Sequence, residues 1–248
     1  MSNGSPIVLY TDFGVGSPYV GQMKAVLVAG VAECRCIDLL HDAPRFDPCS
    51  SAYLLAALVR DMPLGAVYVA VVDPGVGGDR RALWVETERG HFLGPDNGLL
   101  SQVVRMSGDA KVRALAWPEE GMSASFHGRD LFAPAALRLL RGEVLAGTSV
   151  PPDAIVGADW PGMSARIVYI DPFGNLFTGL FFNAVERSMV LEVAGERVRY
   201  ARTFCEVPKG AAFWYGNSSG LVEIAVNQGS AQARFGMRTG DEVTVLKC

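Results

Sequence analysis

The chain has 248 residues, half of them hydrophobic, and a formal net charge of -4 at pH 7. No apolar run approaches the roughly 18 to 20 residues that a membrane-spanning helix needs, so the apolar surplus is expected in a core or a subunit interface. The sequence contains no cluster of lysines and arginines, which makes nucleic acid and anionic membranes poor candidate partners and a small molecule the better one.

The amino terminus and the cysteines indicate in which cellular compartment the protein is expected. The segment before the first predicted strand lacks the basic start and apolar core of a signal peptide, so we expect a cytoplasmic protein. The cysteines are odd in number and include no Cys-x-x-Cys pair: Cys34, Cys36, Cys49, Cys205 and Cys248. This pattern predicts neither a disulfide framework nor a zinc site, and we expect reduced thiols that are mostly buried.

Strands and helices are predicted to alternate over the first part of the chain. The predicted strands cover residues 7–10, 36–40, 66–72, 83–86 and 112–117, and the predicted helices cover residues 19–31, 51–62 and 131–141. The first helix follows Pro18, a favourable first-turn residue. The run at 66–72 is unbroken and β-branched, which is typical of a strand covered on both faces. The alternation predicts a mostly parallel or mixed sheet with helices on both faces.

The character of the sequence changes beyond the last of these helices. Residues 147–154 and 159–162 are rich in proline, glycine and other turn residues, which indicates a linker. Beyond it, short predicted strands cover residues 165–170, 190–193, 198–201, 211–215, 221–225 and 242–246. We therefore expect an α/β domain at residues 1–150, a linker at 151–162, and a smaller all-β domain, a barrel or sandwich, at 163–248.

Carboxylates follow two of the predicted strands. Open α/β sheets bind ligands at the carboxyl ends of their strands. Asp12 could therefore accept hydrogen bonds from a sugar diol, or it could cap the next segment. Asp73 leads into a glycine-rich turn that ends at Arg80. This turn either lets backbone approach a ligand closely or is a plain turn, and it is no Walker loop because the Gly-Lys-Ser/Thr ending is missing.

The histidines and a loop of the second part are further candidates. His127 precedes a predicted helix and, together with Asp73, suggests a site that handles a proton on water, although a lone histidine is more often structural. The same caution applies to His41, and His91 is expected on the surface or in a strand. Asn175 follows the predicted strand at 165–170, and its amide could read an adenine edge or simply cap a turn.

Taken together, these motifs resemble the S-adenosyl-L-methionine hydroxide adenosyltransferases, relatives of the bacterial fluorinase and chlorinase. The resemblance covers nearly the whole chain, in order, through these blocks: Thr11-Asp-Phe-Gly14, Tyr19-Val-Gly-Gln-Met-Lys24, Asp73-Pro-Gly-Val-Gly77 with Arg80, Gly94-Pro-Asp-Asn-Gly98, Phe126-His-Gly-Arg-Asp130, Asp171-Pro-Phe-Gly-Asn175, Asn217-Ser-Ser-Gly220 and Asn227-Gln-Gly-Ser230. It implies an N-terminal α/β/α sandwich domain, a C-terminal β-barrel, and a homotrimer with sites between the N-terminal domain of one subunit and the C-terminal domain of its neighbour.

The resemblance also implies a reaction, in which water attacks C5′ of S-adenosylmethionine and releases adenosine and methionine. The hydrolytic members carry an Asp, Arg, His set that matches Asp73, Arg80 and His127, whereas the halogenases have other residues at the Asp and His positions. Because the sulfonium is an excellent leaving group, the protein needs only an aligned and activated water. An Asp73–His127 pair could take its proton while Arg80 stabilises hydroxide character. The resemblance implies neither a metal nor a cofactor, since S-adenosylmethionine is the substrate.

Substrate-binding roles carry over one by one. Asp12 matches the acid that holds the ribose hydroxyls, Asp171 the acid near the methionine ammonium, and Asn175 the adenine reader. Ser218 falls where the family contacts the methionine carboxylate, and the following Ser219 stands where the fluorinase has an arginine. The walls of the ribose and adenine sites are expected from two aromatic residues, Phe46 and Phe204.

Three other readings stay open. The first is a halogenase of the same fold, which would yield a 5′-halo-adenosine. The second is a metal-dependent nucleotide phosphohydrolase, whose ligands would be His41, Asp42, Asp73, His127 and Asp130. The third is a protein that binds S-adenosylmethionine without turning it over.

Overall fold

A computed structural model describes residues 5–31, 34–116 and 121–247 of the chain. The chain divides into two compact units, Met1–Trp160 and Pro161–Cys248. Within the described residues, no helix is long and apolar enough to cross a membrane.

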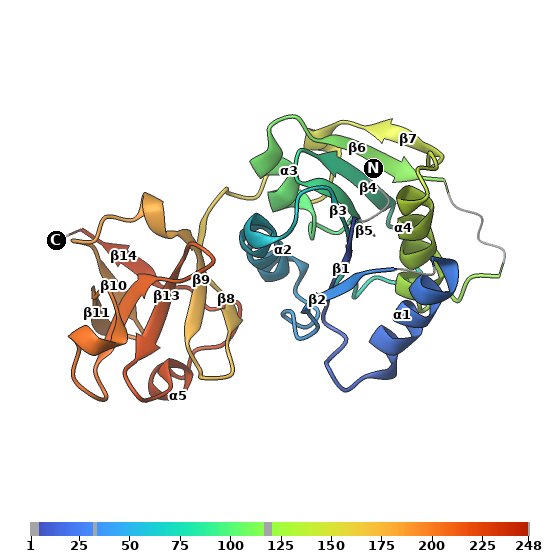
Figure 1. Cartoon of the computed structure of the whole chain (residues 1–248). Coiled ribbons are helices and arrows are strands. Elements are labelled where there is room, and N and C mark those ends of the chain that lie inside the picture. Colours follow the sequence, from blue (N-terminus) through green and yellow to red (C-terminus); the bar gives the residue numbers. More distant parts are fainter. Residues whose placement is uncertain (1–4, 32–33, 117–120, 248) are drawn as a thin grey trace. The chain divides into compact units, whose positions relative to one another are not determined.

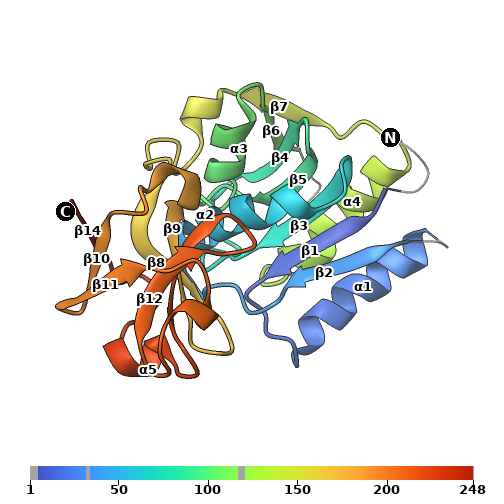
Figure 2. The ribbon, with the colours of Figure 1, turned by 60° about the vertical axis from the view of Figure 1, so that its left-hand side comes forward.

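The first unit is built on a mixed sheet. Its strands are β1 (Ile7–Thr11), β2 (Cys36–Leu40), β3 (Ala66–Val71), β4 (Ala82–Thr87), β5 (Gly90–Pro95), β6 (Lys111–Leu115) and β7 (Gly147–Val150). Their order across the sheet is β2-β1-β3-β5-β4-β6-β7. The pairs β1–β2, β1–β3 and β3–β5 are parallel, and the pairs on the β4 side are antiparallel. Figure 2 shows β1, β2 and β3 side by side.

Helices cover both faces of this sheet (Figure 1). They are α1 (Pro18–Gly30), α2 (Pro48–Leu58), α3 (Ser101–Ser107) and α4 (Ala133–Leu140), with short 3-10 turns at Val59–Asp61 and Pro152–Ala154 and a π-helical turn at Gly128–Phe132. Alternate strand residues such as Leu9 and Val69 share a core cluster with Leu27 of α1 and Ala136 of α4. Tyr10 faces the other way, and its hydroxyl donates to the Ser51 carbonyl of α2. The α/β/α sandwich expected from the sequence is confirmed.

The central strands bring two carboxylates to one edge of the sheet. Every residue of β3 is buried, as the β-branched run predicts for a strand covered on both faces. Because β1 and β3 are parallel and in register at Thr11 and Val71, the residues after them leave the sheet at the same edge. Asp12 and Asp73 therefore start neighbouring loops at the carboxyl ends of their strands.

The second unit is a smaller barrel. Its strands are β8 (Ser164–Ile170), β9 (Leu176–Phe181), β10 (Val190–Val193), β11 (Glu196–Tyr200), β12 (Ala212–Gly216), β13 (Leu221–Val226) and β14 (Thr244–Leu246), joined by 3-10 turns at Phe182–Ala184 and Phe204–Glu206. Their order is β14-β10-β11-β12-β13-β9-β8, and only β11–β12 is parallel. The sheet curls closed where Val243 N donates to the Ala165 carbonyl and Ile167 N to the Asp241 carbonyl. Trp214 is fully buried inside.

Several local expectations need correction. Strands β5, β7 and β9 and helices α3 and α5 (Ala231–Phe235) were not predicted, and α5 is the one α-helix among the described residues of the barrel unit. Helix α2 begins at Pro48, earlier than the predicted residue 51, because the Asp47 carboxylate accepts a hydrogen bond from Ser50 N and caps the helix. The strand predicted at 112–117 ends at Leu115, and residue 117 lies outside the described residues.

The expected burial of the cysteines is wrong for those that the structure describes. Cys34, Cys36 and Cys49 are partly exposed, and Cys205 is exposed. None of these four forms a disulfide bond, and Cys248 lies outside the described residues.

Candidate active site

Asp73 and Arg80 form a buried ion pair at the carboxyl end of β3. Arg80 Nε donates to Asp73 Oδ2 over 2.9 Å, and Arg80 Nη2 donates to the same oxygen. Only 3% of the Asp73 side chain and 11% of the Arg80 side chain are exposed. The intervening turn folds the chain back on itself, and Gly77 is required there because its φ is +82° and a Cβ would lie 2.4 Å from the Ala124 carbonyl oxygen.

Arg80 also holds His127. Its Nη2 lies 2.9 Å from His127 Nδ1. A guanidinium can only donate, so Nδ1 accepts this hydrogen bond and a neutral His127 carries its proton on Nε2. His127 precedes the π-helical turn Gly128–Phe132. The structure therefore brings together Asp73, Arg80 and His127, and it places the arginine as the link between the other two.

The second carboxylate oxygen of Asp73 differs from the first. Asp73 Oδ1 is buried and accepts no hydrogen bond from the described part of the chain. A buried carboxylate oxygen without a donor is costly, which is why such atoms concentrate where a ligand or a reacting group supplies the missing bond.

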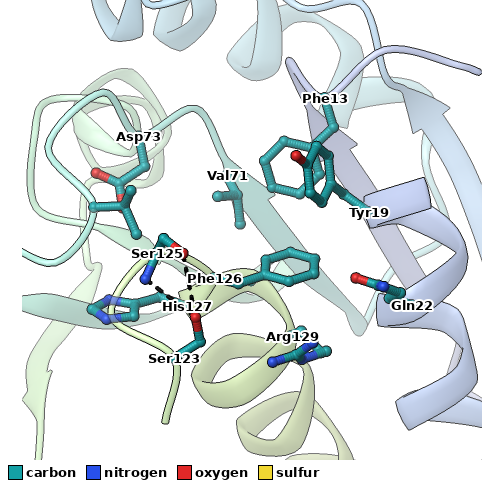
Figure 3. A pocket seen from close by; sticks show the side chains of 12 residues that line it. Phe13, Tyr19, Gln22, Val71, Asp73, Ser123, Ser125, Phe126, His127 and Arg129 are labelled. Carbon is teal, nitrogen blue, oxygen red and sulfur yellow. Dashed lines mark hydrogen bonds between the residues drawn. The ribbon is translucent and has the colours of Figure 1, made fainter. Parts of the chain in front are cut away.

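A cavity of about 410 Å³ opens beside these side chains. In Figure 3, Asp73 and His127 lie on one side of it, and the rings of Phe13, Tyr19 and Phe126 lie toward the other. These three rings meet edge to face, with centroids 5.4 to 5.9 Å apart. The cavity thus has a polar end, formed by Asp73 and His127, and an aromatic wall.

Asp73 also lines a second cavity of the same unit, about 490 Å³ in volume, with Asp12, Arg45 and Phe46. Asp12 is no helix cap, because α1 begins after Ser17; its Oδ2 accepts a hydrogen bond from Phe46 N over 3.1 Å. Burial raises the pKa of Asp12, and the hydrogen bonds from Phe46 N and its own backbone N–H oppose that rise. Phe46 has a φ of +57° and is 75% exposed. Such an exposed ring held in an unusual backbone conformation is suited to contact a ligand or a neighbouring subunit.

The barrel unit has a cavity of its own, about 700 Å³ in volume. It is lined by the four residues that the resemblance selected in this unit: Asp171, Asn175, Phe204 and Ser218. Asp171 Oδ1 accepts from the backbone N–H groups of Phe173 and Asn175, and its Oδ2 accepts from Asn175 Nδ2 over 3.0 Å. The last bond fixes the orientation of the Asn175 amide, with Nδ2 directed toward Asp171.

Sequence reasoning missed Glu223 in this cavity. The residue is only 2% exposed, and Tyr215 donates its hydroxyl proton to Glu223 Oε1. Burial raises the pKa of both side chains. A signal was present in the sequence, since Glu223 is the one charged residue of the otherwise apolar strand β13.

Two of the residues proposed as phosphohydrolase ligands, His41 and Asp130, hydrogen-bond to other protein groups. His41 Nδ1 lies 2.9 Å from Thr11 Oγ1, and its Nε2 lies 3.0 Å from Asp38 Oδ1. Asp130 accepts from Arg129 and from Ser123 N, and these bonds hold the pKa of its carboxyl below the usual value. Among the residues that the structure describes, no three or more His, Cys, Asp or Glu side chains gather as a metal site would require.

Comparison with known proteins decides the family. Residues 7–148 match the SAM hydroxide adenosyltransferase N-terminal domain, and residues 165–244 match the C-terminal domain of the same family. The chain belongs to the SAM hydroxide adenosyltransferase family. A relative from Salinispora arenicola, named (R)-S-adenosyl-L-methionine hydrolase, is 39% identical over 95% of both chains. A relative of the same name from Thermus thermophilus is 38% identical over 97% of this chain and 99% of the relative.

Comparison with solved structures finds the same fold. The crystal structure of a conserved protein from Thermotoga maritima superposes with a TM-score of 0.86 at 29% identity, covering 97% of this chain and all of the other. A fluorinase from Nocardia brasiliensis is a more distant relative, at 22% identity over 97% of this chain and 96% of the relative. The sequence is thus nearer to the family's hydrolases than to this halogenase.

Proposed function

We propose that the protein hydrolyses S-adenosyl-L-methionine to adenosine and L-methionine by attack of an activated water on C5′. The family domains and the relatives named as hydrolases support this substrate. The observation that carries the mechanism is the Asp73–Arg80–His127 cluster, in which a buried carboxylate oxygen accepts no hydrogen bond from the described residues.

The reaction sets the demand on these residues. Methionine leaves from a sulfonium as a neutral thioether, so no general acid is needed. The nucleophile is the difficult part, because the pKa of bulk water is about 15.7 and hydroxide is scarce at neutral pH. The protein must therefore align a water with the C5′–S bond and accept its proton as the C–O bond forms.

The tautomer of His127 indicates which residue accepts the proton of water and which one orients the water. Arg80 neutralises Asp73 through Oδ2, which leaves Oδ1 to accept the proton of the attacking water. A neutral His127 receives a hydrogen bond at Nδ1 and therefore donates from Nε2, so it orients the water oxygen and does not take its proton. The sequence alone predicts that an Asp73–His127 pair takes the proton, and the geometry favours Asp73 as the acceptor.

The substrate-binding residues have separate tasks. Asp12 holds the ribose hydroxyls beside Phe46 in the first unit. In the barrel unit, Asn175 reads adenine next to Phe204, Asp171 lies near the methionine ammonium, and Ser218 contacts the methionine carboxylate.

These two sets of residues belong to separate units. We propose that a homotrimer brings them together across subunit interfaces, as the family resemblance implies. The exposed side chains of Val15, Phe46 and Val76 in the first unit and Phe173 in the second support such an interface. Light scattering of the purified protein would return the mass of three chains if this is right, and the mass of one chain would contradict it.

One incubation separates the alternatives. The protein is mixed with S-adenosylmethionine, alone and with chloride, fluoride or EDTA, and the products are separated by chromatography. We expect adenosine and methionine in equal amounts in every case, with no 5′-halo-adenosine. A halogenated product would favour the halogenase, and loss of activity in EDTA would favour a metal enzyme. Unchanged substrate after incubation with excess protein, under single-turnover conditions, would favour a binding protein.

A further inference from the structure

A chain of polar contacts runs behind Asp12 and involves none of the residues assigned so far to the reaction. His41 is 7% exposed and lies between two partners, with Nδ1 2.9 Å from Thr11 Oγ1 and Nε2 3.0 Å from Asp38 Oδ1. The other oxygen of Asp38 accepts from Lys24 Nζ over 2.5 Å. The contacts therefore link α1, β2 and the end of β1.

The groups at the two ends of this series, Thr11 and Asp38, indicate which atom donates in each hydrogen bond. Thr11 Oγ1 accepts from Phe13 N over 3.3 Å, so its own proton is free to point at His41 Nδ1. His41 then carries its proton on Nε2 and donates it to the Asp38 carboxylate. Burial raises the pKa of Asp38, but the hydrogen bonds from His41 and Lys24 outweigh it and hold that pKa below its usual value. In this arrangement, Thr11 donates to His41, and His41 donates to Asp38.

The backbone around His41 ties together the two loops that line the Asp12 cavity. Gly14 N donates to the His41 carbonyl over 2.6 Å, and Ala43 N donates to the Thr11 carbonyl over 3.1 Å. Phe46 N donates in turn to Asp12 Oδ2. Thr11 is fully buried, so its hydroxyl cannot meet a substrate and its contact with His41 serves to hold the loop.

We propose that His41 is a positioning residue: through Thr11 it fixes the Asp12 carboxylate in the orientation that binds the ribose diol. The inference rests on the proposed function only in taking Asp12 as the ribose ligand. A residue that orients a ligand-binding group through a locked hydrogen bond changes ligand discrimination when it is replaced, even though it does not touch the ligand.

Two substitutions separate the two hydrogen bonds of His41. In His41→Asn, the amide oxygen takes the place of Nδ1 and can still accept from Thr11, whereas in His41→Gln the amide reaches toward Asp38 and the acceptor for Thr11 is lost. The matched control is His91→Gln, because His91 is a half-buried histidine of the same unit whose Nδ1 accepts from Trp84 Nε1. Thr11→Val removes the same hydrogen bond from the other side, with Thr11→Ser as its conservative partner.

The readout is the ratio of the dissociation constants of 2′,3′-dideoxyadenosine and adenosine, measured by calorimetry. We expect His41→Gln and Thr11→Val to reduce this ratio about tenfold, since a misplaced Asp12 loses the diol, while His41→Asn, Thr11→Ser and His91→Gln stay near the parent value. KM for S-adenosylmethionine should rise in the same two variants more than kcat falls.

The opposite results are equally clear. An unchanged ratio in Thr11→Val, or equal weakening of both nucleosides, would show that the network only supports stability and would overturn the proposal. A parent protein that binds the two nucleosides equally would also overturn it. Because nucleoside binding requires no turnover, absence of hydrolysis would count against the proposed function alone.

Discussion

Two histidines of the first unit, each near an aspartate and a basic side chain, have opposite environments. His127 is held by Arg80, and the Asp73 on the far side of that arginine is buried with one oxygen that accepts no hydrogen bond from the described residues. His41 is bonded at both ring nitrogens, and both oxygens of its partner Asp38 accept hydrogen bonds.

We call Asp73, Arg80 and His127 the reactive cluster, and Lys24, Asp38, His41 and Thr11 the supporting cluster. The two differ in whether their hydrogen-bonding groups are all paired within the protein. In the reactive cluster, a buried oxygen of Asp73 beside the cavity can still accept a hydrogen bond. Leaving this oxygen unpaired costs stability, which other parts of the fold must offset. In the supporting cluster, both ring nitrogens of His41 and both oxygens of Asp38 already have partners within the protein. These contacts therefore hold the neighbouring loops in place. Residue types alone do not distinguish the two, and the substitutions below do.

The largest effect is expected at the acid of the reactive cluster. Asp73→Asn keeps the shape but removes the proton acceptor, so kcat should fall at least tenfold, up to the factor of about 10² to 10⁴ that positioned proton transfer contributes, with little change in KM. Steady-state kinetics check this. Unchanged turnover would remove Asp73 from the mechanism.

Arg80→Ala should lower kcat about 100-fold, because it releases His127 and leaves the Asp73 carboxylate without its cation. Breaking a buried pair from one side also costs about 3–5 kcal/mol in the free energy of unfolding, to be read from urea denaturation. If the alanine variant fails to fold, Arg80→Lys is used in its place. It keeps the positive charge but cannot hydrogen-bond to Asp73 and His127 together, so kcat should also fall.

A matched control for Arg80→Ala lies at the next residue. Arg81 pairs with Asp96, whose side chain is also only 3% exposed. Arg81→Ala should therefore reduce stability while kcat stays close to the parent value. If Arg80→Ala and Arg81→Ala lower kcat equally, the loss of activity reflects a general loss of stability and not a catalytic role of Arg80.

His127→Ala should lower kcat at least about tenfold with little change in KM, since it removes the donor that orients the water. His127→Gln places an amide N–H near the position of Nε2 and should restore part of the rate. Kinetics over a range of substrate concentrations separate the two constants. Full activity of the alanine variant would exclude His127 from the chemistry.

The smallest effect is expected at the supporting cluster. Hydrogen bonds from His41 and Lys24 keep the pKa of Asp38 low against the opposing effect of burial. A carboxyl whose pKa is lower in the folded state stabilises the protein above its unfolded pKa of about 3.9, and this stabilisation is lost as pH falls through the folded pKa.

Asp38→Asn should therefore be less stable than the parent near pH 7, and the difference should shrink as the pH falls below about 4. Urea denaturation at several pH values measures this. A difference that grows on acidification would contradict the assigned hydrogen bonds.

The sequence indicated much of the fold and the positions of the acids. The β-branched run at 66–72 predicted a strand covered on both faces, and parallel pairing with β1 then places Asp12 and Asp73 at one edge. Strand β5 escaped prediction because its sequence, Gly-His-Phe-Leu-Gly-Pro, carries turn-forming residues at both ends. It is a strand through its pairing with β3 and β4, which only the tertiary structure supplies.

The detailed geometry of the site lay beyond sequence reasoning. The contact of Arg80 with both Asp73 and His127 depends on a turn that places Arg80 seven positions after Asp73, and on a helix start 47 positions further along the chain. Neither spacing is periodic, so no pattern could show which acceptor each guanidinium nitrogen meets. The tautomer of His127 and the unmatched oxygen of Asp73 follow only from those contacts.

The central claim is that water attacks C5′ of S-adenosylmethionine. Hydrolysis in ¹⁸O-labelled water, followed by mass spectrometry of the products, tests it directly. We predict one ¹⁸O atom in the 5′-hydroxyl of adenosine and none in methionine. Unlabelled adenosine, or label in a fragment of the amino-acid chain with release of 5′-methylthioadenosine, would contradict the claim.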